Sequence, residues 1–121
     1  RGRVTEKDIE ELFYYYLMQN QELVDRQGAF KRGRLDRLFK DRLVKYIVYE
    51  LKKGTAPIST LKQITGYMQQ VRQKYGISKK TQIKGIVLCK DADPRLYEMV
   101  KHSKSYPVEI KKYCFEISMK K

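Results

Sequence analysis

The sequence predicts an α/β fold in which helices pack on a mixed β-sheet, and three observations lead to this prediction. Residues 43–51 and 83–89 are largely apolar and rich in β-branched side chains, which is typical of strands buried on both faces. Between them, apolar residues recur every three or four positions over residues 58–75, as in an amphipathic helix. The chain has 121 residues, of which 41% are hydrophobic, so it can bury the core of one domain. We therefore treat residues 1–121 as a single domain.

The first third of the chain predicts one helix followed by two short strands. Thr5 and Asp8 have the spacing of a capping box, and the apolar residues after them recur at helical spacing. These features predict a helix over about residues 5–19. Between Glu22 and Phe39, short extended stretches are separated by glycines, which predicts two strands.

The middle of the chain predicts a strand, a helix and a second strand. We expect Gly54 and Pro57 to end the strand that covers residues 43–51. The helix over residues 58–75 should end at Gly76, because glycine readily adopts the left-handed conformation common after a helix. The next apolar segment then forms the second buried strand.

The last third predicts a short helix and a final strand. Asp93 and Pro94 form an N-cap and N1 pair, and apolar residues continue the helix to Val100. Residues 108–117 fit a last strand. The predicted order of elements is therefore α-β-β-β-α-β-α-β, with the helices packed on the sheet.

The charge of the chain predicts a polyanionic partner. Lysine and arginine number 27 against 14 acidic residues, a net charge of +13, which favours nucleic acid over an anionic membrane. No apolar run approaches the roughly 20 residues that span a bilayer, and Cys89 and Cys114 lack metal-binding or disulfide spacing. We expect a cytoplasmic protein in a reducing environment. Because the chain begins at Arg1, we expect it to be a fragment of a longer protein.

Two charged residues lie at the end of the central predicted strand. Glu50 and Lys52 are two positions apart, so both side chains lie on one face of the strand. The other residues on that face are bulky and apolar. A carboxylate and an ammonium there are costly to desolvate unless they pair or bind a metal. The alternative is a strand end that emerges into solvent.

Asp36, on the preceding strand, is a second candidate carboxylate. A simple antiparallel register centred on residue 41 places Asp36 opposite Tyr46, roughly 13 Å along the strand from Glu50. A bulge or strong twist near Gly33 would have to shorten this separation. The alternative interpretation of Asp36 is a solvated hairpin aspartate.

Three polar residues on the predicted helices border apolar faces. Gln63 and Tyr67 are spaced i, i+4 and form one patch on the second helix. Glu10 borders the apolar face of the first helix. Each of the three could equally be an ordinary polar residue at the edge of the core.

Taken together, these residues resemble the PD-(D/E)XK nuclease superfamily and, more narrowly, the catalytic domain of the NucS/EndoMS endonucleases. The segments that carry the resemblance are Gly33-Arg34-Leu35-Asp36, Val48-Tyr49-Glu50-Leu51-Lys52-Lys53-Gly54 and Gln63-Ile64-Thr65-Gly66-Tyr67-Met68. Residues 5–10 and 85–97 are similar to the start and the later elements of the same domain. The resemblance implies a restriction-endonuclease-like core with the order of elements given above.

The resemblance also implies a divalent-metal-dependent endonuclease that hydrolyses phosphodiester bonds in DNA. Mismatched, branched or single-stranded DNA would be the substrate, in DNA repair at the nucleoid. Asp36, Glu50 and the backbone carbonyl of Leu51 would bind Mg²⁺ or Mn²⁺, because hard oxygen ligands suit these ions.

The remaining implied site residues surround the attacking water. Lys52 would orient or deprotonate this water and stabilise the negative charge beside it. Gln63 and Tyr67 would align the water, the lysine or a phosphate, and Glu10 would hold a water at the metal. Basic residues would grip the DNA backbone without reading its sequence. They are Arg32, Arg34, Arg37, Lys53, Lys62, Arg72, Lys79 and Lys80.

Two other functions remain as alternatives at this point. One is a non-catalytic, basic nucleic-acid-binding module that has kept the nuclease fold, and the other is a basic ribosome-associated or RNA-binding protein. Full-length members of the family that this chain resembles have an N-terminal DNA-binding and dimerisation domain, for which 121 residues leave no room. A homodimer would let two sites cut both strands, but the sequence leaves the oligomeric state open.

Overall fold

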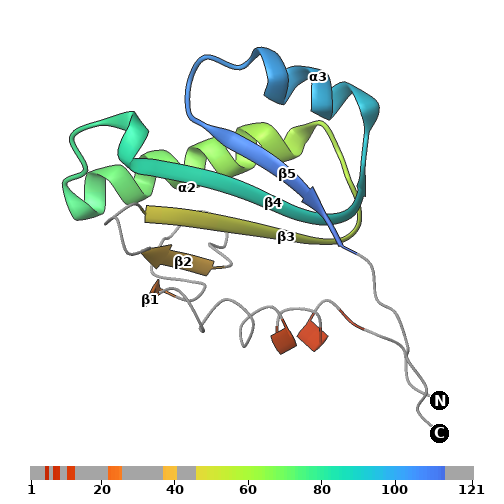
Figure 1. Ribbon diagram of the computed structural model, residues 1–121, viewed down its shortest axis with the longest axis horizontal. Helices are drawn as coiled ribbons and strands as arrows, with labels where there is room; N and C mark the ends of the chain where they lie inside the picture. Colours follow the sequence, from red (N-terminus) through yellow and green to blue (C-terminus); the bar gives the residue numbers. More distant parts are fainter. Residues whose placement is uncertain are drawn as a thin grey trace, which may run out of the picture.

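A five-stranded mixed β-sheet, with strands in the order β1-β2-β3-β4-β5, forms the centre of the fold (Figure 1). In the computed structural model, residues 46–113 are described throughout, together with the backbone of residues 22–25 and 37–39. Six further residues are described individually, namely Thr5, Lys7, Asp8, Glu11, Leu12 and Lys40.

The strands differ in direction on the two sides of β3. β1 (Glu22–Asp25) pairs antiparallel with β2 (Arg37–Lys40), and β2 pairs antiparallel with β3 (Tyr46–Ala56). β4 (Ile83–Ala92) and β5 (Val108–Lys112) continue the sheet on the other side in parallel. β3 therefore has hydrogen-bonded neighbours along both edges, which fits its largely apolar first half.

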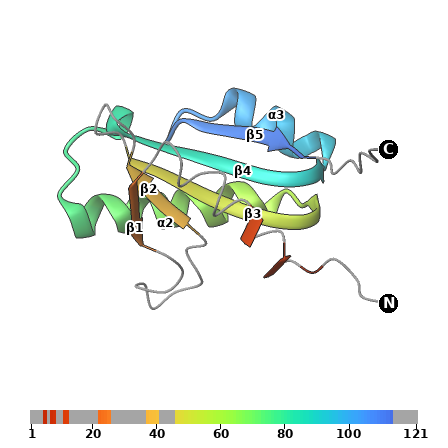
Figure 2. The same ribbon diagram turned by 60° about the horizontal axis from the view of Figure 1, so that its bottom comes forward.

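Two helices cover one face of the sheet (Figures 1 and 2). α2 (Ser59–Tyr75) connects β3 to β4, and α3 (Pro94–His102) connects β4 to β5, because parallel strands need a crossover connection. A short 3₁₀ turn, η1 (Lys80–Gln82), precedes β4. α2 ends at Gly76, whose φ of 63° lies in the left-handed region. No helix in the described part of the chain is long and apolar enough to cross a membrane.

These elements confirm the predicted fold class and most of the predicted starts. α2, β4, α3 and β5 begin within one or two residues of the expected positions, and Gly76 ends α2 as predicted. At the first predicted helix, the four described residues from Lys7 to Leu12 are helical, and the rest of residues 5–19 lies outside the described chain. The expected cap is present. The Thr5 N–H donates to Asp8 Oδ2 (2.9 Å), and the Asp8 N–H donates to Thr5 Oγ1 (3.1 Å).

Three strand ends differ from the predictions. β3 continues through Gly54 to Ala56, because its register with β4 shifts between Lys52 and Thr55 and the strand then resumes pairing. A glycine is compatible with such a bulge, so Gly54 does not stop the strand. β4 likewise extends to Ala92. The last strand was expected over residues 108–117, but β5 ends at Lys112, and residues from 114 onward are not described.

The predicted register between β2 and β3 is wrong. Arg37 pairs with Tyr49 and Lys40 pairs with Tyr46, so the pairing is centred near residue 43 and not on residue 41. Residues 41–45, between the two paired segments, lie outside the described residues. Because of this register, Arg37 faces the residue immediately before Glu50, and the expected separation of roughly 13 Å does not apply to this part of β2.

The sheet is buried on both faces by different sets of side chains. On the helix-covered face, side chains of β3 and β4 pack against α2 and α3. The fully buried members include Val48, Ile64, Met68, Val87 and Leu96. The second cluster consists of Ile47, Tyr49, Leu51, Ile86 and Leu88, with Tyr113 packed against it. Alternate residues of β3 therefore lie in different clusters, as expected from the alternation of side chains in a strand.

α2 lies unusually close to β4 at Gly85. A Cβ atom at Gly85 would lie 2.7 Å from Sδ of Met68 and 3.0 Å from Cδ1 of Ile64. Both of these side chains are fully buried, so they have little room to move. Glycine at this position therefore sets the distance between helix and sheet. By contrast, a Cβ at Gly66, inside α2, would meet no atom within 4 Å.

We expect Gly85→Ala and Gly66→Ala to change stability in opposite directions. Gly85→Ala should lower the free energy of unfolding by about 1–3 kcal/mol because it overpacks the core. Gly66→Ala should raise it by about 0.4–1 kcal/mol because alanine has less backbone entropy to lose in a helix. Urea unfolding of both variants measures the difference. A Gly85→Ala protein as stable as the parent would contradict the close approach of α2.

Asp93 caps the N-terminus of α3. Its Oδ1 accepts a hydrogen bond from the Arg95 N–H (2.9 Å), and its Oδ2 contacts Nη2 of Arg95 (2.8 Å). The pKa of Asp93 lies below its ordinary value of 3.8, first because the Arg95 side chain hydrogen-bonds to it and second because the Arg95 N–H does so. The ionised carboxylate therefore favours the folded state.

This cap predicts a pH-dependent difference between the parent chain and Asp93→Asn. Since the folded-state pKa is depressed, the carboxylate stabilises the fold above pH 3.8, and this contribution is lost as pH falls through the folded pKa. Asparagine can still cap the helix but carries no charge. We expect the parent to have the higher urea midpoint near neutral pH and the two midpoints to converge in acid. A difference that stays constant with pH would exclude this contribution.

Candidate functional site

Two charged side chains of β3 lie on the face that α2 covers. Val48, two positions before Glu50, belongs to the cluster beneath the helices, whereas Tyr49 and Leu51 belong to the opposite cluster. Alternation therefore directs Glu50 and Lys52 toward α2. The side chain of Glu50 is only 5% exposed and that of Lys52 is 25% exposed. The expected shared face is confirmed, and Glu50 is buried where the alternative interpretation required a solvated strand end.

A chain of polar contacts links these residues to α2. Lys52 Nζ lies 3.3 Å from Glu50 Oε2 and donates a hydrogen bond to Gln63 Oε1 (3.0 Å). Gln63 Nε2 in turn lies 3.4 Å from the Tyr67 hydroxyl and donates to it. Tyr67 is buried in the core, so its hydroxyl gives Gln63 a fixed partner. The structure thus brings together four of the predicted site residues: Glu50, Lys52, Gln63 and Tyr67.

The electrostatics of this group follow from the burial of Glu50. A carboxylate removed from water is costly unless a cation lies close to it, and the Lys52 ammonium supplies that charge. An ammonium has three N–H donors, and the contacts to Glu50 and Gln63 use two of these donors. Because Lys52 is partly exposed, its ammonium can also hold an anionic group or a water molecule that reaches the site from solvent.

The oxygen atoms of this site suit a hard divalent cation. Glu50 provides a carboxylate, and the next residue, Leu51, provides a backbone carbonyl. Oxygen donors of this kind are the ligands that Mg²⁺ and Mn²⁺ prefer. Among the residues that the structure describes, no three His, Cys, Asp or Glu side chains gather as a metal site. The second predicted carboxylate ligand, that of Asp36, lies outside the described residues.

Sequence reasoning did not identify Tyr113 as part of this region. Its hydroxyl donates to the carbonyls of Lys52 (3.2 Å) and Lys53 (2.5 Å), and its N–H donates to the carbonyl of Cys89 (3.0 Å). Tyr113 therefore holds the backbone of β3 where the register begins to shift. The contact joins residues about 60 positions apart in sequence, so no local pattern could have indicated it.

The other predicted site residues are only partly covered by the structure. Asp36 and Glu10 lie outside the described residues, so their proposed roles stay predictions. The backbone of Arg37 pairs with Tyr49 beside Glu50, but its side chain is not described. Arg32 and Arg34 also fall in the part of the chain without a description.

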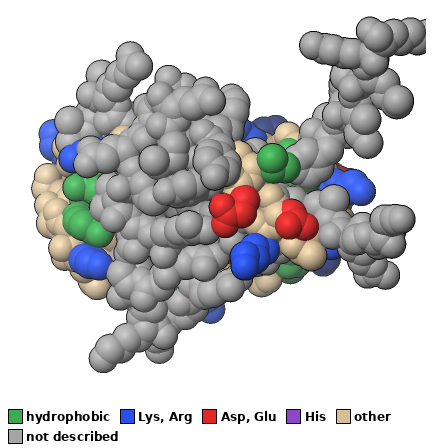
Figure 3. All heavy atoms as spheres, turned by 90° about the horizontal axis from the view of Figure 1, so that it is seen from below, with side chains coloured by type: hydrophobic (Ala, Val, Ile, Leu, Met, Phe, Trp, Pro, Cys, Tyr) green, Lys and Arg blue, Asp and Glu red, His purple; other side chains and the backbone are tan. Residues whose placement is uncertain are grey.

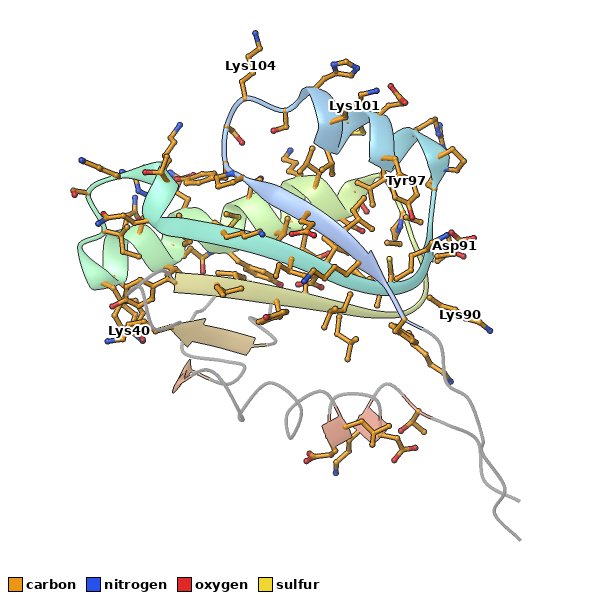
Figure 4. The ribbon with its side chains drawn as sticks, viewed as in Figure 1. Lys40, Lys90, Asp91, Tyr97, Lys101 and Lys104 are labelled. Carbon is orange, nitrogen blue, oxygen red and sulfur yellow. The ribbon has the colours of Figure 1, made fainter. Side chains whose placement is uncertain are left out.

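The described basic residues surround the sheet and do not form one patch. Lys53 and Lys62 are exposed, as are Lys79 and Lys80, whereas Arg72 is half-buried. Figure 3 shows lysine and arginine side chains at several separate places around the face seen from below. In Figure 4, Lys40 lies at the end of β2 and Lys90 at the far end of the sheet. This distribution fits contacts to an extended polyanion better than one compact anion site.

Comparisons with known proteins agree with the predicted resemblance. The family described as "Endonuclease NucS C-terminal domain" matches residues 6–113. No curated protein matches the sequence.

Solved structures support the same fold. The chain is similar to a structure of EndoMS in complex with double-stranded DNA, with a TM-score of 0.75 and 19% identity over 93% of this chain and 46% of that one. It is also similar to a repair endonuclease from Pyrococcus abyssi (TM-score 0.72, 16% identity, 93% and 48%). A structure of EndoMS in its apo form gives a TM-score of 0.71 at 19% identity, with 93% and 48% covered. The chain therefore spans less than half the length of these three proteins.

Proposed function

The chain belongs to the endonuclease NucS C-terminal domain family, and from this membership we propose that it is a divalent-metal-dependent endonuclease domain that hydrolyses phosphodiester bonds in DNA. The observation that carries the proposal is the contact chain from the buried Glu50 through Lys52 and Gln63. These contacts bring the Glu50 carboxylate, the Lys52 ammonium and the Gln63 amide together at the edge of α2. The partly exposed Lys52 ammonium connects the buried Glu50 carboxylate to solvent, which supports a role in binding a group that enters from outside.

The reaction requires charge to be neutralised on the phosphate while water attacks phosphorus. We propose that Asp36, Glu50 and the Leu51 carbonyl hold Mg²⁺ or Mn²⁺, and that such an ion stabilises the phosphate charge and makes a nucleophile available near neutral pH. Lys52, which lies 3.3 Å from Glu50, orients or deprotonates the attacking water and balances the negative charge that builds up beside it. The P–O bond to the departing strand then breaks, which leaves one phosphate end and one hydroxyl end.

Gln63, Tyr67 and Glu10 complete the proposed site. Gln63 holds the Lys52 ammonium in place, and Tyr67 holds the Gln63 amide. These contacts remove rotational freedom from a long side chain, which favours one orientation of the ammonium during the reaction. We assign Glu10 to the water at the metal from the family resemblance alone.

The proposed substrate is DNA that departs from a perfect duplex, namely mismatched, branched or single-stranded DNA. The similar EndoMS structure is a complex with double-stranded DNA, and the similar Pyrococcus abyssi protein is a repair endonuclease. The net charge of +13 supports a polyanionic substrate of this kind. Exposed residues such as Lys53 and Lys62 are proposed to contact phosphates.

We expect Asp36→Asn and Glu50→Gln each to lower cleavage by about 10²-fold or more, because several kcal/mol of charge stabilisation would be lost. The assay uses labelled perfect duplex, mismatched duplex, splayed-arm and single-stranded DNA, with Mn²⁺, Mg²⁺ or EDTA. EDTA should remove the activity of the parent chain. Glu98→Gln is the matched control, because the Glu98 carboxylate lies on the exposed side of α3 and contacts only His102 among the described residues.

Two results of this assay would contradict the proposal. Cleavage by Glu50→Gln at the parent rate would exclude the site. DNA binding with a steep salt dependence, but no cleavage of any substrate with either metal, would instead favour a non-catalytic binding module.

A second variant tests the positioning of Lys52. Gln63→Ala removes the acceptor that holds the ammonium, so we expect the cleavage rate to fall by about 10–100-fold. DNA affinity should change little, because Gln63 acts on the lysine and not on the bound strand. Single-turnover cleavage and binding without metal separate the two effects. Ser59→Ala, at the exposed start of α2, is the control. An equal loss of affinity and rate would show that Gln63 binds DNA directly.

A further inference from the structure

A pocket with a volume of about 590 Å³ lies at the opposite end of α2 from Gln63. It is formed by the last turns of α2, the segment around η1 and the loop that leads into β5. The residues that line it include Gln69, Arg72, Gln73, Lys80 and Tyr106. Its volume falls within the range of roughly 300–1,000 Å³ that is typical of small-molecule sites.

The pocket combines positive charge with an aromatic ring. Arg72 and Lys80 both approach the ring of Tyr106, with the guanidinium carbon at 5.9 Å and the ammonium nitrogen at 5.2 Å from its centroid. No acidic residue is among the described side chains that line it. Two amide side chains, those of Gln69 and Gln73, add hydrogen-bonding groups on the α2 side. This chemistry is suited to a ligand with both an anionic and an aromatic part.

Arg72 is held rigidly in this pocket. Its Nε donates to the carbonyl of Ile77 (3.1 Å), Nη2 to the carbonyl of Ser78 (2.8 Å) and Nη1 to the Tyr106 hydroxyl (3.4 Å). These bonds use three of the five N–H donors of a guanidinium. Arg72 therefore holds the ring of Tyr106 in place. Because its own side chain is already fixed, its charge stays at the pocket without a further loss of side-chain freedom when a ligand binds.

Lys80, by contrast, can adapt to a ligand. It is exposed, and in the described part of the chain it contacts the ring of Tyr106. A base that stacks on this ring would displace the ammonium to the side, where it could pair with the phosphate of the same nucleotide. The ring, the movable lysine and the two glutamines are thus arranged for one nucleotide unit.

We propose that this pocket binds a nucleotide of the DNA strand as a second contact, separate from the cleavage site. The inference rests on the proposed function and extends it to how the strand is held. Gln63 and Arg72 are nine positions apart on α2, so they lie about 14 Å apart along the helix axis and, at about 100° per residue, on opposite sides of the helix. Lys79, beside Lys80, adds positive charge at the same end of the molecule.

The test measures DNA binding in the presence of EDTA, so it does not depend on cleavage. The probe is a fluorescently labelled 12-nucleotide single strand, titrated with the 121-residue chain at several salt concentrations. We expect Lys80→Gln to reduce the slope of log affinity against log salt by about 0.7, the value for one phosphate contact in a single strand. Lys101→Gln is the matched control. It removes the same charge from exposed α3, away from the pocket lining, and should leave the slope nearly unchanged (Figure 4).

A pair of tyrosine variants tests the stacking. Tyr106→Leu removes the ring and should weaken binding of the 12-nucleotide strand by about 5–10-fold, whereas Tyr106→Phe keeps the ring and should bind within about 2-fold of the parent. Photocrosslinking of a strand that contains 5-iododeoxyuridine should label Tyr106 in the parent chain. Because crosslinking is measured on the parent chain, its result does not depend on whether a variant folds.

Several results would overturn the proposal. Equal salt slopes for Lys80→Gln and Lys101→Gln would do so, as would crosslinking that never reaches Tyr106. Saturation of the pocket by thymidine monophosphate, without any effect of these variants on the 12-nucleotide strand, would assign it to free nucleotides and not to the strand. A chain that binds through the pocket but never cleaves DNA would refute the proposed function and leave this inference intact.

Discussion

Burial of the Glu50 carboxylate beside α2 is the constraint on which the rest of the candidate site depends. On the helix-covered face of a central strand, a carboxylate loses most of its hydration and needs a cation close to it. Lys52, two positions further along β3, shares this face and supplies that cation. The lysine then needs a neutral acceptor on the helix, which Gln63 supplies. The identities of these three residues are therefore linked by the cost of a single buried charge.

The backbone around Lys52 is held from the opposite face of the sheet. The β3–β4 register shifts directly after this residue, and a shifted strand loses part of its ladder of hydrogen bonds. Tyr113 compensates, because its hydroxyl donates to the carbonyls of Lys52 and Lys53 while its side chain packs on the second cluster. The polar group beneath α2 and the apolar cluster on the far side thus support the same two residues. Stability of the second cluster is in this way tied to the position of the Lys52 ammonium.

The sequence predicted those features that depend on local periodicity. The two-residue spacing of Glu50 and Lys52 placed them on one face of the strand, and the spacing of Gln63 and Tyr67 placed them on one side of α2. Features that depend on distant pairing were not predictable. The register of β2 is set by the length of a connection with no strong turn signal, so the expected position of Asp36 opposite Tyr46 was wrong. The contact of Tyr113 with β3 and the pocket around Tyr106 join segments that are far apart in sequence.

α2 contributes residues to both sites that are proposed to contact DNA, and the two parts of the helix depend on different interactions. Near Gln63 the helix contributes a neutral amide to a buried charge, and its order there depends on the core residue Tyr67. Near Arg72 it contributes a guanidinium that also satisfies the carbonyls of Ile77 and Ser78 after the helix ends. Charge and stability are therefore inseparable at Arg72, since its loss would leave those carbonyls without this donor. Charge and stability are separable at Lys80, because its exposed ammonium contributes charge without supporting the backbone. A change of residue 80 can therefore alter the affinity for a DNA strand without a cost in stability.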